Sequence, residues 1–87
     1  MFMDEFKTYI VYFIPHRAAP TWTSKRATSE KAVLEWFDSA EPDAEAILAV
    51  YPESDDPGVG NRPMFAQDLK DGAEEMDDVM YDHHHRL

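Results

Sequence analysis

The sequence predicts a small α+β domain with a single-layer sheet, one helix packed on the sheet and an acidic C-terminal helix. Residues 7–14 and 45–51 are rich in β-branched and aromatic side chains, which is typical of strands. Residues 28–40 and 64–83 carry apolar side chains at helical spacing. The predicted order is therefore β-α-β-α, or β-β-α-β-α if a short strand follows the first one.

The first predicted strand is residues 7–14, and its residues 9–14 are apolar without alternation. This pattern is typical of a strand that is covered on both faces or central in its sheet. Pro15 ends the run, and a loop with a second proline follows. Residues 21–25 are then predicted to return beside the first strand as the second arm of a hairpin.

The first predicted helix begins after Thr28, whose hydroxyl is suited to cap the amides of the first turn. Pro42 marks its end. The next strand is residues 45–51, which Pro52 terminates. A strand, a helix and a second strand in one sheet favour parallel neighbours joined by a right-handed crossover, and we expect that arrangement here.

Residues 52–63 are predicted to form a loop because Pro, Gly, Asn and Asp are concentrated there. Residues 64–83 then suit a helix with an apolar arc and an acidic arc on opposite sides. Gly72 lies inside this helix, where it either costs about 1 kcal/mol relative to Ala or divides the helix in two.

The composition excludes several classes of function but does not identify one. A chain of 87 residues allows one domain, residues 1–87, and the lack of Cys excludes disulfides and thiolate metal sites. The net charge of −10 argues against direct binding to nucleic acid or to an anionic membrane. No apolar stretch reaches the length of a membrane span or a signal peptide, so we expect a cytoplasmic protein.

The charge is unevenly distributed along the chain. Residues 1–34 carry five basic and three acidic side chains, whereas residues 35–82 carry fifteen acidic and two basic ones. This asymmetry predicts an acidic surface formed by the last helix and the loop before it. The candidate partner-binding residues on this surface are Asp68, Asp71, Glu74, Glu75, Asp78, Asp82, Glu53, Asp55 and Asp56.

The acidic arc lowers the stability of the helix. Each pair of like charges four residues apart weakens a helix by a few tenths of a kcal/mol. A sequence that keeps such pairs either uses the arc to bind a partner or is adapted to high salt. Carboxylates spaced about 4.5–6 Å along a helix can imitate a phosphate backbone and enter a groove built for anions. The alternative is an ordinary amphipathic helix whose solvent face is acidic.

A smaller basic and aromatic segment precedes the first helix. Trp and Arg are favoured at binding hot spots, so this segment is a candidate for a secondary contact with a partner. The alternative is that its bases pair with the acidic half and that the Trp covers the edge of the core. The residues concerned are Arg17, Trp22, Lys25 and Arg26.

No motif indicates catalysis, a cofactor or a metal, and we expect a protein that is not an enzyme. The consecutive residues His83, His84 and His85 point about 100° apart on a helix and do not converge on one ion, so a solvated tail is favoured. Three acids in the loop offer ligands for a hard cation but lack the pattern of an EF-hand. A metal-dependent hydrolase that uses His16 or the terminal histidines ranks last.

In size, acidity and lack of a catalytic signature, the chain resembles the small acidic inhibitors of phages and mobile elements, including DNA mimics and anti-CRISPR proteins. This resemblance implies a non-enzymatic protein that occupies a basic groove of a nucleic-acid-processing protein. The alternative is a structural or interaction module that forms a homodimer, with acidity serving only solubility or halophily.

Overall fold

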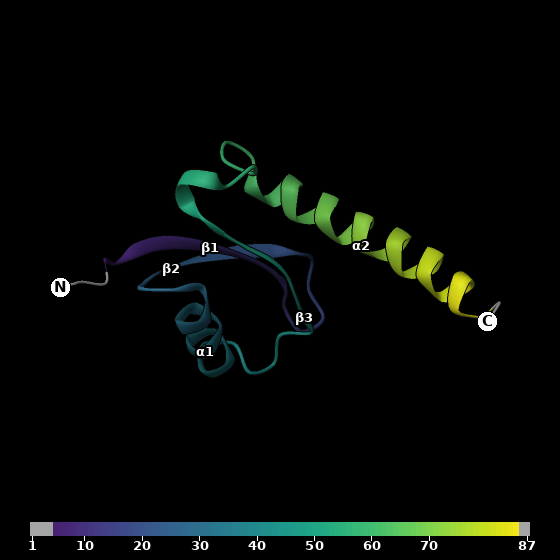
Figure 1. Ribbon diagram of the computed structural model, residues 1–87, viewed down its shortest axis with the longest axis horizontal. Coiled ribbons are helices and arrows are strands. Elements are labelled where there is room, and N and C mark those ends of the chain that lie inside the picture. Colours follow the sequence, from purple (N-terminus) through teal and green to yellow (C-terminus); the bar gives the residue numbers. More distant parts are fainter. Residues whose placement is uncertain (1–4, 86–87) are drawn as a thin grey trace.

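The computed structural model describes residues 5–85, with side chains described for residues 5–73. It confirms the order β-β-α-β-α and the α+β class (Figure 1). A 3-10 turn, η1, stands between the last strand and the last helix. The elements are β1 (Lys7–Ile14), β2 (Thr21–Ala27), α1 (Glu30–Ala40), β3 (Ala46–Pro52), η1 (Glu53–Asp55) and α2 (Arg62–His85).

The three strands form one antiparallel sheet in the order β2-β1-β3. The expected parallel pairing of β1 and β3 is therefore wrong. The hairpin reverses the chain before α1 begins, so the helix leaves from β2 rather than from β1. The two strands that α1 connects, β2 and β3, do run parallel to each other, but β1 lies between them.

The central strand β1 has both faces buried, as its uninterrupted apolar sequence predicts. Tyr9, Val11 and Phe13 pack with α1 on one face of the sheet. Ile10 and Tyr12 pack against the first turns of α2 on the other face. Because each large apolar side chain contributes about 1.5–3 kcal/mol when fully buried, this single strand anchors both halves of the core.

Helix α1 covers one face of the sheet through Val33 and Phe37, which are fully buried (Figure 1). Its cap is Ser29, one residue after the expected Thr28. The Ser29 hydroxyl accepts a hydrogen bond from the Ala32 amide at 3.1 Å. Since the amide at this position of the first turn has no partner within the helix, the cap defines where α1 starts.

Helix α2 starts at Arg62, two residues before the predicted start, and runs through Gly72 without a break. Pro63 is tolerated because amides in the first turn have no intrahelical acceptor. Ala66 is fully buried against the sheet. Beyond these first turns the helix extends past the sheet (Figure 1). Among the described residues, neither helix combines the length and apolarity of a membrane span.

Candidate protein interface

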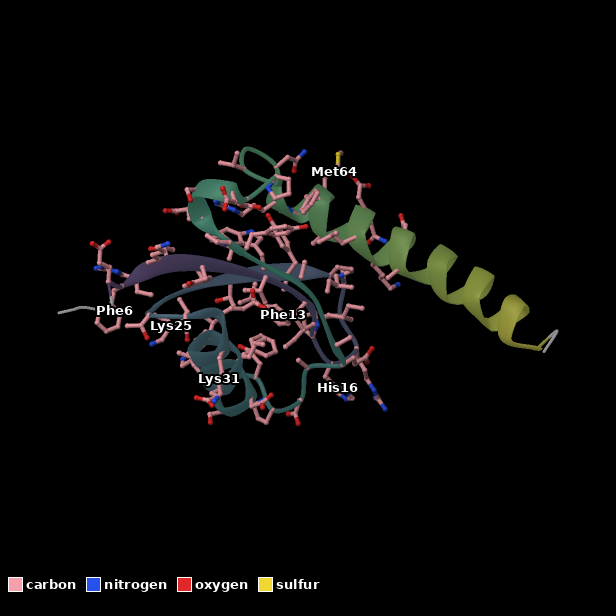
Figure 2. All side chains as sticks on the ribbon, in the orientation of Figure 1. Phe6, Phe13, His16, Lys25, Lys31 and Met64 are labelled. Carbon is pink, nitrogen blue, oxygen red and sulfur yellow. The ribbon has the colours of Figure 1, made fainter. Side chains whose placement is uncertain are left out.

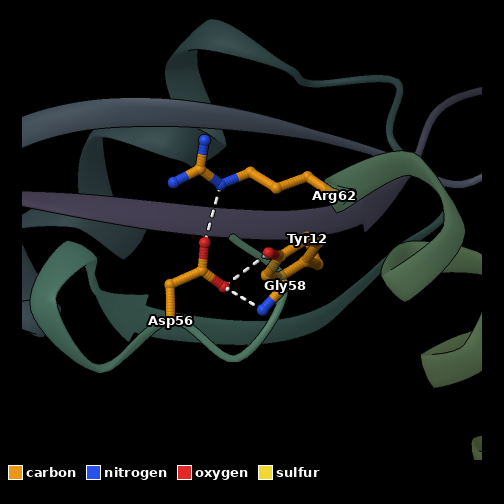
Figure 3. Close-up of polar contacts among 4 residues, drawn as sticks. All are labelled: Tyr12, Asp56, Gly58 and Arg62. Carbon is orange, nitrogen blue, oxygen red and sulfur yellow. Dashed lines mark hydrogen bonds and ion pairs between the residues drawn. The ribbon is translucent and has the colours of Figure 1, made fainter. Parts of the chain in front are cut away.

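Asp56, expected on the acidic surface, is instead buried at the start of the segment that joins η1 to α2, and its side chain points toward Tyr12, Gly58 and Arg62 (Figure 3). Its Oδ1 accepts hydrogen bonds from the Tyr12 hydroxyl at 2.5 Å and from the Gly58 amide at 2.9 Å. Its Oδ2 accepts from Arg62 Nε at 2.6 Å. We call these four residues the Asp56 cluster. The prediction that Asp56 belongs to the exposed acidic surface is wrong, because both of its oxygens accept hydrogen bonds within the protein.

The electrostatics of the Asp56 cluster keep its groups in fixed protonation states. Burial alone would raise the pKa of Asp56, but hydrogen bonds from Tyr12, Arg62 and Gly58 and the charge of Arg62 outweigh it and lower the pKa. Burial, the hydrogen bond to Asp56 and the charge of Asp56 raise the pKa of Tyr12 far above its ordinary value. At neutral pH the cluster therefore holds a carboxylate and a protonated phenol.

The Asp56 cluster attaches α2 and its preceding loop to the sheet. Tyr12 comes from the central strand, and Arg62 is the first residue of α2. The Arg62 guanidinium also lies over the ring of Trp22 on β2, 4.7 Å from its centroid. A Cβ at Gly58 would collide with the Tyr12 hydroxyl and the Phe65 ring, so glycine is required for this close approach. These contacts fix the orientation of α2.

The remaining acidic candidates divide into two groups. Glu53 and Asp55 on η1 and Asp68 and Asp71 on α2 are exposed, so the structure places these four carboxylates at the surface. Asp71 accepts a hydrogen bond from Gln67 Nε2 at 3.0 Å, one turn earlier on the same helix. The side chains of the other candidates lie outside the described residues: Glu74, Glu75, Asp78 and Asp82.

The four basic and aromatic candidates do not form one patch. Trp22 and Lys25 lie on β2 and not in a loop, and they face opposite sides of the sheet because side chains alternate along a strand. Trp22 packs on the side of α2, whereas Lys25 Nζ lies 5.3 Å from the Trp36 ring centroid on the side of α1. Arg17 and Arg26 are exposed, in the hairpin turn and on β2 respectively. The partly buried Trp22 packs against the core cluster of Ile10, Tyr12 and Ala66, as the alternative interpretation expects of it.

The histidine and loop candidates do not form a metal centre in the described part of the chain. His16 is exposed, with Nδ1 4.0 Å from Glu45 Oε2. Of the acids in the loop, Asp56 is not free to bind a metal, because it is bonded to its buried partners. The residues with described placement contain no group of three metal-ligating side chains. His83, His84 and His85 lie outside the described side chains.

The sequence patterns do not predict the exposed apolar side chains near the start of α2. Val59 is 69% exposed and Met64 is 61% exposed, and Met64 points away from the body in Figure 2. They border a hollow of about 200 Å³, here called the Val59–Met64 hollow. An apolar residue between two glycines in a polar loop is the sequence signal that could have identified it. The hollow is lined by Pro57, Gly58, Val59, Asn61, Met64, Phe65 and Asp68.

Comparison with protein-family models, with curated proteins and with solved structures finds no match for this chain. The function is therefore inferred from the surface of the molecule.

Proposed function

We propose that this protein is a non-enzymatic binding protein that presents its acidic surface to a basic groove of a nucleic-acid-processing protein, in the manner of a DNA-mimicking inhibitor. The carboxylates concerned are those of η1 and α2. The arginine and lysine side chains of such a groove would bind them in place of phosphates. The proposed class includes phage-type and anti-CRISPR-like inhibitors.

The observation that carries this proposal is the exposure of Asp68 and Asp71 on a helix whose start is fixed to the sheet. The partly buried ion pair between Asp56 and Arg62 holds the first residue of α2. A fixed helix presents its carboxylates at a constant spacing, so less conformational entropy is lost on binding. The net charge of −10 would add long-range attraction to a cationic partner and accelerate association.

The test compares two charge reversals of equal size on opposite faces of the sheet. Asp68→Lys with Asp71→Lys alters α2, and Glu35→Lys with Asp38→Lys alters exposed positions on α1. Each immobilised variant is incubated with a cell lysate at low and at high salt. We then identify the captured nucleic-acid-binding proteins that duplex DNA displaces. Circular dichroism establishes that both variants keep the fold.

We expect the α2 variant to lose these proteins, the α1 variant to retain them and high salt to release them, since exposed charges are screened. Equal capture by both variants would refute the proposal. Equal loss from both would also refute it, because net charge rather than the α2 surface would then account for binding. A concentration-dependent dimer in sedimentation, insensitive to both reversals, would favour the homodimer.

A further inference from the structure

We propose that the Val59–Met64 hollow receives one apolar side chain of the partner protein, flanked in the partner by arginine or lysine. This inference depends on the proposed function and specifies its contact. The carboxylates attract basic partners, and the hollow selects among them.

The hollow combines exposed apolar side chains with a firm base. Val59 and Met64 form its rim, and each is more than half exposed. Phe65 lies between the hollow and the core, where its ring packs edge-on against Tyr12 at 5.1 Å between centroids. Exposed apolar side chains that gather around one depression, rather than lying scattered, are a feature of protein contact sites. A contact here would bury surface that the isolated protein leaves in water.

Backbone hydrogen bonds tie down the loop that carries Val59 on both sides. The Gly58 amide donates to the buried Asp56 carboxylate at 2.9 Å, and the Asn61 amide donates to the Gly58 carbonyl at 3.0 Å. Gly60 between them has φ +97°, which a residue with a side chain rarely adopts. Asn61 Nδ2 also lies 3.7 Å from Met64 Sδ across the rim. A pre-formed loop loses little entropy when a partner docks.

The charge around the hollow selects the chemistry of the occupant. Asp68 lies in its wall, and Asp71 follows one turn later on α2. Glu53 and Asp55 are exposed on η1, a few residues before the loop. Of the described residues that line the hollow, none is basic. An apolar side chain between two cations would pack against the apolar rim while its neighbours pair with the carboxylates of the wall. Acidic neighbours would instead be repelled by those carboxylates.

Two synthetic peptides test the inference with the full-length protein. One contains a central Phe between arginines and lysines, and the other replaces that Phe with Ala, so both have the same charge. Fluorescence anisotropy measures their affinities for the wild type, for Val59→Ser with Met64→Ser, and for Ile47→Ser. Ile47 is the matched control because it is exposed and borders a separate hollow beside α1. Heteronuclear NMR locates the bound peptide.

We expect the wild type and Ile47→Ser to bind the Phe peptide about fivefold more tightly than the Ala peptide, the effect of a modest apolar hot spot. Val59→Ser with Met64→Ser should bind both peptides equally while retaining salt-sensitive affinity. The NMR shifts should centre on residues 57–65. Equal affinity of the wild type for both peptides, or shifts elsewhere, would overturn the inference. No salt-sensitive binding of either peptide would instead refute the proposed function.

Discussion

Removal of the Asp56 carboxylate tests how α2 is attached to the sheet. In Asp56→Ala, the Tyr12 hydroxyl and the Gly58 amide lose their acceptor at buried positions. Each buried donor without a partner costs about 1–3 kcal/mol. Arg62 is 19% exposed, so water can replace part of its lost interaction. We expect the free energy of unfolding to fall by about 3 kcal/mol, out of roughly 4–13 kcal/mol for a domain of this size.

Urea denaturation followed by circular dichroism measures this loss. Asp55→Ala is the matched control, since Asp55 is adjacent but exposed, and we expect a change within about 0.5 kcal/mol. Asp56→Asn keeps an acceptor oxygen and should lie between the two, which preserves a readout if Asp56→Ala does not fold. Equal midpoints and slopes for Asp56→Ala and Asp55→Ala would refute the structural role of the Asp56 cluster.

Three further predictions concern the same face of the sheet. Because the folded state lowers the pKa of Asp56, its stabilising contribution is present above the ordinary value of 3.8 and is lost as the pH falls through the lowered value. Urea midpoints at acidic pH should therefore fall more steeply for the wild type than for Asp56→Asn. Gly58→Ala should lower stability by about 1–3 kcal/mol in urea denaturation, because its Cβ would collide with Tyr12 and Phe65. Gly72→Ala, which meets no atom within 4 Å, should instead raise helicity in circular dichroism and add about 1 kcal/mol.

The strands and helices could be predicted because their sequence patterns report local burial. Residues 9–14 are apolar throughout, since α1 covers one face of β1 and α2 covers the other. The pairing of β1 with β3 could not be predicted in the same way. It depends on whether the hairpin reverses the chain before α1, and the polar segment 21–25 has too weak a strand pattern to decide that alone.

The role of Asp56 is a long-range property. Its hydroxyl partner, Tyr12, is 44 residues away in the sequence. In isolation Asp56 resembles its neighbour Asp55, and both are acids in a loop rich in Pro and Gly. A signal did exist, because a Tyr in the middle of a strand buried on both faces needs a partner for its hydroxyl. Neither local spacing nor composition says which of the many carboxylates provides it.

Net charge alone would not let this protein distinguish one basic partner from another. A surface of −10 attracts many polycations, and exposed ion pairs contribute about 0–1 kcal/mol each. Selectivity requires a feature that a wrong partner cannot satisfy. The Val59–Met64 hollow is the feature proposed to do so, and the Gly58 amide holds the loop at its edge to Asp56. A variant that weakens the Asp56 cluster without unfolding the protein, such as Asp56→Asn, should therefore reduce the preference for the Phe peptide more than it reduces affinity for the Ala peptide.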